Sequence, residues 1–198
     1  MNIRSAIQSS LDEAQTVLNQ FIKNPKNIKI MDEAVRLITG VFERRGRIFA
    51  CGNGGSMCDA MHFAEEWTGR FRKNREPLPA IALSDVAHLT CVANDFGFDE
   101  VFARPILALG HPDDLLIAIS TSGNSTNVLR AIEAAKSRGM KVFGLLGKDG
   151  GNIKRHCDLC LIAPGSTSDR IQEIHMKVLH ILIESVERLM FPDNYAES

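Results

Sequence analysis

Four hydroxyl side chains and a glycine are concentrated in the segment Ser120–Ser125, whose sequence is STSGNS. The segment follows an apolar run at 115–119, typical of a buried parallel strand, and precedes a helical pattern over about 126–138. At such a turn the backbone N–H groups and the positive end of the helix dipole converge on an anion, and hydroxyls can donate further hydrogen bonds. The segment has neither the Lys of a P-loop nor a dinucleotide fingerprint. It therefore predicts a site for a small phosphate monoester such as a sugar phosphate, with capping of the helix by Asn124 or Ser125 as the alternative.

A second glycine-rich loop, Gly52–Ser56 (GNGGS), directly follows a short predicted strand at 47–51. Its glycines permit positive φ angles and a close approach of the backbone to a ligand. A helix is expected from about 57 to 69, so this loop is also a strand-to-helix junction. An ordinary tight turn has the same composition, but in an open α/β sheet such loops gather at the carboxyl ends of the strands, where ligands bind. Two strand-to-helix turns at the same edge of one sheet, each able to bind an anion, therefore strengthen the prediction of a ligand site.

The helix after this loop contains His62 and Glu66, which are four residues apart and share one face. The pair suits metal binding or proton transfer, although it is not the HExxH zinc motif. An exposed pair on a helix surface is equally compatible with the spacing. The basic loop at 70–75 (RFRKNR) that follows is interpreted as a solvated surface.

The final helix is predicted to begin at 168 or 169 and to end near 190, and it is apolar almost all round after its first turn. Such a helix is buried on most sides, which in a chain of this size indicates a subunit interface. His180 lies in it, and either Gln172, about 80° away around the helix, or Glu173, seven residues away, can share a site with it. The periodicity leaves both open, and a satisfied interface histidine is an equally compatible role for His180.

The segment 94–98 (NDFGF) is interpreted as a turn between a short helix at 86–93 and a helix at 101–108 that Asp99 caps. Asp95 in this turn suits contact with the hydroxyls of a ligand. A structural role in the turn is equally compatible.

The remaining elements predict the fold class. Strands are expected at 47–51, 80–83, 115–119, 141–146 and 158–163, and they alternate with helices. This alternation predicts an α/β fold with a parallel, helix-flanked sheet of five strands. Two helices, at 3–23 and 27–45, precede the first strand and are expected to pack on a partner subunit or over the site. Because no Pro/Gly/Ser-rich linker interrupts the chain, a single domain over 1–198 is expected, with the helices in 1–45 and the α/β core in 46–198.

The composition favours a soluble, cytoplasmic protein. The 198 residues are 44% hydrophobic and carry a net charge of −1, which argues against strong nonspecific binding to nucleic acid or to a membrane. The first residues lack the apolar core of a signal peptide, and no apolar run reaches the roughly 20 residues of a transmembrane helix. The five cysteines are scattered and odd in number, which indicates free thiols in a reducing compartment. Cys157 and Cys160 form a CxxC, but no second CxxC or nearby His pair completes a zinc site.

Taken together, six segments resemble the sugar isomerase (SIS) family, and within it the sedoheptulose-7-phosphate isomerases, also called phosphoheptose isomerases. The segments are CGNGGS (51–56), DAMHFAEEWTGRF (59–71), VANDFGFDEVF (92–102), ISTSGNS (119–125), GKDGG (147–151) and DRIQEIHMKVLHIL (169–182). Their joint occurrence in this order is highly specific, whereas STSGNS alone indicates only the wider family. The resemblance implies an SIS-type three-layer αβα sandwich with a five-stranded parallel sheet and additional N-terminal helices.

The resemblance also assigns roles to matching positions. Glu66 and His180 match an acid/base pair, and these two with His62 and Gln172 match a zinc site described in some members. The resemblance thus selects Gln172 over Glu173 and Glu66 over Glu65. The positions that match substrate contacts are Asn53, Gly54, Gly55, Ser56, His62, Glu66, Asn94, Asp95, Ser120, Thr121, Ser122, Ser125, Asp169 and Gln172.

By this resemblance the chain is expected to be an isomerase that converts D-sedoheptulose 7-phosphate to D-glycero-D-manno-heptose 7-phosphate through an enediol, the first step towards the heptose of lipopolysaccharide. The family implies one zinc ion per subunit, with partial occupancy, and a homotetramer with active sites at subunit interfaces. The alternative is a non-catalytic paralogue that binds the replication initiator protein, with which the chain shares the segment ALGHPDDLLIAIS and a tail ending near Phe191. Such paralogues lack a glutamate at the position of Glu66, so the enzyme is favoured.

Overall fold

Five parallel strands form one sheet in the order β2-β1-β3-β4-β5. The computed structural model describes residues 2–196. The strands are β1 (Ile48–Cys51), β2 (Ala80–Ala82), β3 (Leu115–Ser120), β4 (Lys141–Gly147) and β5 (Leu159–Ala163). The predicted α/β class and the five parallel strands are confirmed.

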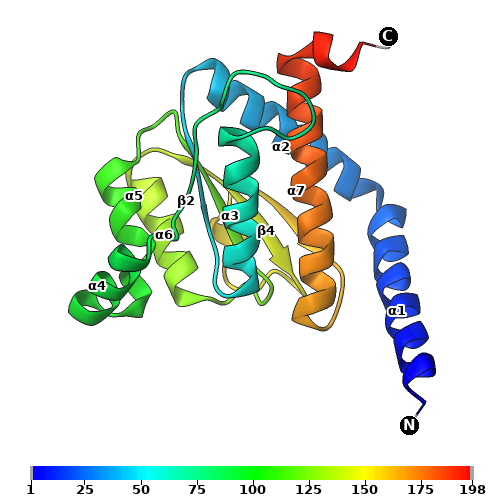
Figure 1. The fold of residues 1–198 in the computed structure, drawn as a ribbon. Helices are drawn as coiled ribbons and strands as arrows, with labels where there is room; N and C mark the ends of the chain where they lie inside the picture. The colour runs from blue at the N-terminus through cyan, green and yellow to red at the C-terminus, as the bar shows by residue number, and fades with distance from the viewer. Residues whose placement is uncertain (1, 197–198) are drawn as a thin grey trace.

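Helices precede and separate the strands (Figure 1). They are α1 (Ile3–Lys23), α2 (Pro25–Glu43), α3 (Gly55–Thr68), α4 (Val86–Phe96), α5 (Ala103–Leu109), α6 (Thr126–Ser137) and α7 (Ser168–Met190). Short 3₁₀ turns lie at Phe98–Glu100, Lys154–His156 and Pro192–Tyr195. Within residues 2–196, no helix combines the length and the apolarity that crossing a membrane requires.

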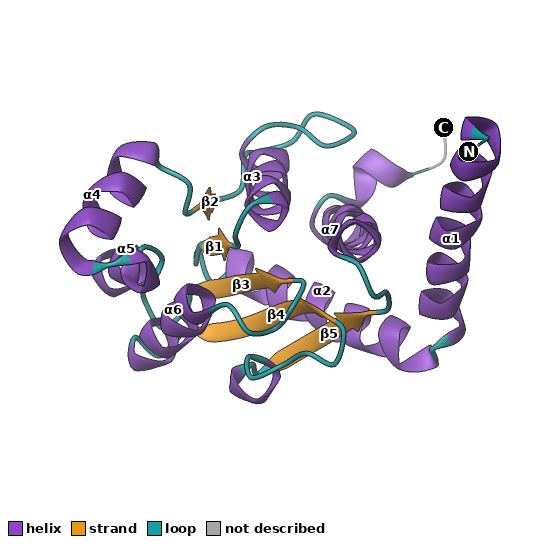
Figure 2. Cartoon of the chain, turned by 90° about the horizontal axis from the view of Figure 1, so that it is seen from below, coloured by secondary structure: helices purple, strands orange, loops and turns teal. Residues whose placement is uncertain are grey.

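Alternate residues of the central strands face two separate hydrophobic clusters, as the two-residue period of a strand requires. In β3, Leu115, Ile117 and Ile119 pack with α2, α3 and α7, whereas Leu116 and Ala118 pack with α5 and α6. Figure 2 shows α4, α5 and α6 on one side of the strands and α3 and α7 on the other. The architecture is therefore a three-layer αβα sandwich, and its parallel strands are buried on both faces.

The strand order places a topological switch between β1 and β3. From β1 the chain continues outward to β2, while β3 leads in the opposite direction to β4 and β5. Ligands of open α/β sheets bind outside the carboxyl ends of the strands at such a point. The loops that follow β1 and β3 there are the two glycine-containing segments 52–54 and 121–125.

Two local predictions were wrong in the region before β3. The helix α4 continues to Phe96, so Asn94 and Asp95 lie in its last turn rather than in a loop. Asp99 does not cap the following helix; it lies in the 3₁₀ turn Phe98–Glu100, and α5 begins at Ala103 after Phe102. The 3₁₀ turn occupies the positions at which a capped helix was expected, because the chain leaves α4 through Gly97 with φ of 90°.

His175 on α7 is buried against the end of β4. Its Nε2 donates a hydrogen bond to the carbonyl oxygen of Leu146 at 3.0 Å, and its Nδ1 has no hydrogen-bond partner among the described residues. Burial lowers the pKa of this imidazole from 6.5 to about 4, against the opposing effect of the Leu146 hydrogen bond. The folded state therefore favours the neutral ring.

Acidification is expected to destabilise the protein through His175. Because the folded pKa lies below the unfolded one, the stabilising contribution is present above pH 6.5 and is lost as the pH falls towards 4. The loss amounts to about 3 kcal/mol at 1.36 kcal/mol per pKa unit. Urea unfolding at pH 7 and pH 4 measures it, with His175→Gln as a non-titrating control that retains a donor for Leu146. Equal losses in the two proteins would show that His175 does not carry the effect.

Candidate active site

The segment Ser120–Ser125 forms a compact hydroxyl-rich turn between β3 and α6. The hydroxyl of Ser120 is 3.2 Å from that of Ser125 and accepts a hydrogen bond from the amide N–H of Gly123 at 3.1 Å. The hydroxyl of Ser122 accepts from the amide N–H of Asn124 at 3.1 Å. These contacts hold the hydroxyls in place at the N-terminus of α6, where the positive end of the helix dipole favours an anion.

The capping alternative for this segment is wrong. Ser125 occupies the N-cap position of α6, but its side chain makes no capping hydrogen bond there. Asn124 instead bridges away from the helix, because its Oδ1 accepts a hydrogen bond from the amide N–H of Asn152 at 3.0 Å. The hydroxyl of Ser125 contacts that of Ser120 instead of the backbone of α6, and because a hydroxyl both donates and accepts, it can still bond to a ligand.

The glycine loop after β1 is tied to the same helix. Asn53 and Asn127 exchange two amide hydrogen bonds, each of 2.8 Å. Gly54 has φ of 56°, a conformation that glycine adopts without strain, and α3 starts at the next residue. The loops after β1 and β3 thus meet at the topological switch, as their positions in the sequence predict.

Replacing Gly123 by Ala is expected to disrupt the hydroxyl-rich turn. Gly123 has φ of 65°, and an added Cβ would meet the carbonyl group of Gly150, with the amide nitrogen of Gly151 at 2.7 Å. Backbone atoms cannot move aside as a flexible side chain can, so the two loops must separate. We expect Gly123→Ala to cost about 1–3 kcal/mol of stability and to weaken phosphate binding. Urea unfolding and a phosphate titration measure both effects; unchanged phosphate affinity would argue against the turn as the binding site.

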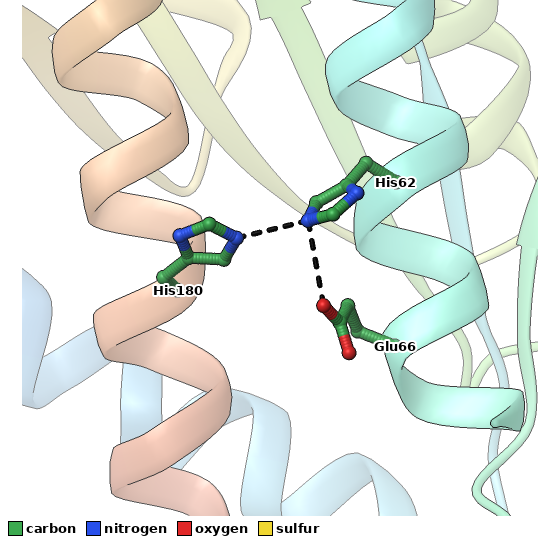
Figure 3. A group of neighbouring side chains, drawn as sticks. All are labelled: His62, Glu66 and His180. Atoms are coloured by element: carbon green, nitrogen blue, oxygen red, sulfur yellow. Dashed lines mark hydrogen bonds and ion pairs between the residues drawn. The ribbon is translucent and has the colours of Figure 1, made fainter. Parts of the chain in front are cut away.

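A second cluster joins α3 to α7 (Figure 3). Nε2 of His62 lies 2.9 Å from Nε2 of His180 and 3.4 Å from Oε1 of Glu66. Nδ1 of His62 lies 3.4 Å from Oε1 of Glu65, whose side chain is 62% exposed, compared with 15% for Glu66. The structure thus brings three of the predicted residues together across two helices that are more than 100 positions apart in the sequence.

The surroundings of this cluster change the acidity of two of its members. Burial raises the pKa of Glu66, and the negative charges of Glu65 and Glu187 raise it further, against the opposing charges of His62 and Arg75. Burial, with His62 and Lys177, lowers the pKa of His180. The two shifts bring the pKa of the carboxyl group and the pKa of the imidazole closer together, which favours proton exchange between them.

The other predicted site residues lie at the ends of these helices. The carboxamide of Gln172 lies against Gly55, at the opposite end of α3 from Glu66. Asp169 is exposed in the first turn of α7, and a side-chain hydrogen bond with Thr167 lowers its pKa. Asn94 and Asp95 are exposed at the end of α4, where the amide of Asn94 donates to Asp95 at 2.7 Å.

Sequence reasoning missed three residues around the site. Ser168, at the start of α7, has its hydroxyl 3.2 Å from that of Thr121 and so extends the hydroxyl-rich turn. Asn127 holds the glycine loop, as described above. The interpretation of 70–75 as a solvated surface was wrong for Arg75. Only 1% of its side chain is exposed, and it forms an ion pair with Glu187. Nothing in the local pattern of a basic loop distinguishes a buried arginine from an exposed one.

The donor set of the cluster fits a divalent transition metal. The ligand atoms of His62, Glu66 and His180 all lie within 4.8 Å of one another. Two imidazole nitrogens and one carboxylate oxygen form the three-ligand set of catalytic zinc sites, which leave a further position for water or substrate. Among residues 2–196, these three form the one such group of His, Cys, Asp and Glu side chains. Cys157 and Cys160 are free thiols outside it, as predicted.

Comparisons with known proteins agree with this arrangement. The SIS domain family matches residues 11–147, so the α/β fold and its loops at the strand ends define an SIS-domain protein. A phosphoheptose isomerase of Fusobacterium nucleatum is 51% identical over 197 residues, which cover 100% of both chains. A phosphoheptose isomerase of Histophilus somni is 57% identical over 182 residues, covering 91% of this chain and 93% of that one.

Solved structures give the same result. The structure of a phosphoheptose isomerase from Francisella tularensis has a TM-score of 0.90 and 34% sequence identity, and the match covers 95% of this chain and all of that one. The chain belongs to the phosphoheptose isomerase family of SIS-domain proteins.

Proposed function

We propose that this protein is an aldose–ketose isomerase that converts D-sedoheptulose 7-phosphate to D-glycero-D-manno-heptose 7-phosphate. The observation that carries the proposal is the contact of His180 on α7 with His62 and Glu66, which lie on α3, the helix that starts at the glycine loop. From Gly55 to His62 this helix rises about 10 Å. Because the hydroxyl-rich turn that binds the phosphate lies beside the glycine loop, this rise suits a substrate whose reacting carbons lie several bonds from its phosphate, as C1 and C2 of a ketose 7-phosphate do.

The reaction moves a proton between C1 and C2 through an enediol. Because the carbon acid is weak, it needs both a positioned base and stabilisation of the developing oxyanion. Glu66 removes the proton from one carbon and returns it to the other, and its raised pKa makes the carboxylate a stronger base. His180 transfers protons at the substrate oxygens, and its lowered pKa keeps a neutral ring available near neutrality.

The phosphate is bound by the hydroxyl-rich turn. Ser120, Thr121, Ser122 and Ser125 donate hydrogen bonds to its oxygens at the N-terminus of α6. The sugar hydroxyls contact the glycine loop and the polar residues Asn94, Asp95, Asp169 and Gln172. Binding of the phosphate at one end of the substrate positions C1 and C2, at its other end, beside Glu66 and His180. The binding energy of the phosphate thus lowers the entropic cost of aligning the reacting atoms.

Zinc is the proposed metal, bound by His62, Glu66 and His180, with Gln172 as a fourth ligand after a change of its side-chain conformation. When bound, it supplies Lewis-acid polarisation of the substrate oxygens. A set without a thiolate and with a weak amide ligand is consistent with partial occupancy.

The active unit is proposed to be a homotetramer with the sites at subunit interfaces. Large apolar side chains are exposed along one face of α1, at Ile3, Ile7 and Leu11. A groove of about 550 Å³ between α2 and α7 is lined by further exposed apolar residues, among them Ile28 and Leu189. Exposed apolar surfaces of this kind support association between copies of the chain.

Parallel assays on five-, six- and seven-carbon ketose phosphates test the proposed function. Turnover restricted to, or fastest with, sedoheptulose 7-phosphate is the expected result. Faster turnover of a pentose or hexose phosphate would make the protein a different isomerase. The non-catalytic alternative is not supported, since Glu66 and His180 are both present and the relatives above are named as isomerases.

A further inference from the structure

Arg75 lies in the loop between α3 and β2, and only 1% of its side chain is exposed. Its Nε donates to Oε1 of Glu187 at 2.7 Å, and its Nη2 donates to the backbone carbonyl of Glu66 at 2.7 Å. Its Nη1 donates to the backbone carbonyl of Trp67 at 2.7 Å. A buried charge is tolerated only when it is paired and hydrogen-bonded, as this guanidinium is. Neither the proposed proton transfer nor the proposed phosphate binding uses Arg75.

The carbonyl contacts of Arg75 close the C-terminal end of α3. The last four carbonyl groups of a helix lack partners within the helix, and those of Glu66 and Trp67 are among them. A cation at this end also interacts favourably with the helix dipole. Arg75 therefore fixes the backbone of the residue whose side chain belongs to the catalytic cluster.

The ion pair of Arg75 ties this end of α3 to α7. Glu187 follows His180 by seven residues, which is about two turns, so both lie on the same face of α7. The second carboxylate oxygen of Glu187 accepts a hydrogen bond from the hydroxyl of Tyr195 at 2.7 Å. Phe71, in the same loop as Arg75, places its ring 5.8 Å from that of His180. The loop after α3 therefore contacts both halves of the proposed acid/base pair.

We infer that Arg75 is a positioning residue for the reaction: by joining the last turn of α3 to Glu187 on α7, it sets the separation between Glu66 and His180. This inference rests on the proposed roles of Glu66 and His180. A misplacement of about 1 Å costs about 100-fold in rate, so loss of the connection should lower kcat. KM should change little, because the phosphate is bound by a turn that Arg75 does not contact.

The variant Arg75→Met/Glu187→Met separates positioning from stability. Replacing a buried ion pair by apolar residues of similar volume is often neutral or stabilising, whereas removing one partner leaves an unpaired buried charge. The double variant therefore keeps the core filled but removes the hydrogen bonds that Arg75 donates to the carbonyl groups of Glu66 and Trp67. The matched control is Arg72→Met/Glu184→Met, since Arg72 pairs with Glu184 on α7 at 2.9 Å from the same loop and is 52% exposed.

Three measurements are made on both variants: the melting temperature, kcat and KM with sedoheptulose 7-phosphate, and, in a crystal structure, the distance between the Nε2 atoms of the His62 and His180 rings, called the ring distance below. We expect about a 100-fold lower kcat and a ring distance well above 2.9 Å in the first variant only. Wild-type kcat or an unchanged ring distance in a folded double variant would overturn the inference. If the double variant does not fold, Arg75→Lys takes its place. Lysine keeps a positive charge beside the Glu187 carboxylate but lacks the planar guanidinium group that donates several hydrogen bonds at once. Wild-type kcat in Arg75→Lys would overturn the inference equally. Absence of turnover in the unmodified protein would contradict the proposed function, while the ring distance would still decide the role of Arg75.

Discussion

Glu66→Gln is expected to lower kcat for the interconversion of sedoheptulose 7-phosphate by roughly 10³-fold. The amide has nearly the shape of the carboxylate but cannot accept a proton from carbon. The side chain is 15% exposed and pairs with His62 at 3.4 Å, so the neutral replacement leaves no unpaired buried charge. Steady-state kinetics measure the loss, and calorimetric titration with the substrate measures binding, which should persist because the phosphate is bound elsewhere.

Glu65→Gln provides the matched control. Glu65 is the adjacent glutamate on α3, but its side chain is 62% exposed, so it should retain most of the wild-type kcat. A near-normal kcat in Glu66→Gln would exclude Glu66 as the base. Equal losses in the two variants would mean that the charge around His62, rather than a particular base, supports the reaction.

Arg75→Ala is expected to produce the largest loss of stability. It leaves the carboxylate of Glu187 buried without a counterion and removes the hydrogen bonds to the last carbonyls of α3. Breaking a buried pair in this way costs about 3–5 kcal/mol. For a chain of this length that corresponds to a fall of roughly 6–20 °C in Tm.

Urea unfolding and calorimetric melting measure this loss, with Arg72→Ala as the control. The pair of Arg72 with Glu184 is half-exposed, and such pairs contribute about 0–1 kcal/mol. If Arg75→Ala costs no more than Arg72→Ala, the buried pair does not stabilise the contact between α3 and α7.

The central strands and the loops after them were predictable because local rules determine them. β3 is a continuous apolar run, and Ser120–Ser125 follows it directly, so burial and a hydroxyl-rich turn can be predicted from adjacent residues. The parallel sheet follows from the alternation of strands and helices. The meeting of the loops after β1 and β3 then follows from the topology, without any knowledge of side-chain contacts.

The cluster of His62, Glu66 and His180 needed more than local rules. Helical spacing placed His62 and Glu66 on one face but did not distinguish a catalytic pair from an exposed one. The contact of 2.9 Å with His180 depends on how α3 packs against α7, which no spacing along the chain specifies. The resemblance to the phosphoheptose isomerase family predicted that His180 lies with His62 and Glu66. It also indicated Glu66 rather than Glu65, and Glu66 is the less exposed of the two.

Arg75 and Asp99 show where sequence reasoning stops. The loop RFRKNR has no periodicity that would indicate a buried side chain. Arg75 is buried because it contacts the distant residue Glu187 and backbone carbonyl groups, and since every residue has a carbonyl group, the sequence does not reveal that contact. Asp99 is of a residue type that often caps the N-terminus of a helix, but the path of the chain after Gly97 places it in a 3₁₀ turn instead. Irregular segments take their conformation from tertiary contacts, and sequence patterns do not report those contacts.

The proposed site isomerises a seven-carbon sugar phosphate. The most direct test is an NMR assay of the wild-type protein with sedoheptulose 7-phosphate, run with added zinc and, separately, with a chelator. We expect signals of an aldoheptose 7-phosphate in the presence of zinc, and a slower reaction with chelator if the metal takes part. Detectable binding of the sugar phosphate without any aldoheptose product, under either condition, would contradict the proposed function and indicate a protein that binds sugar phosphates without turning them over.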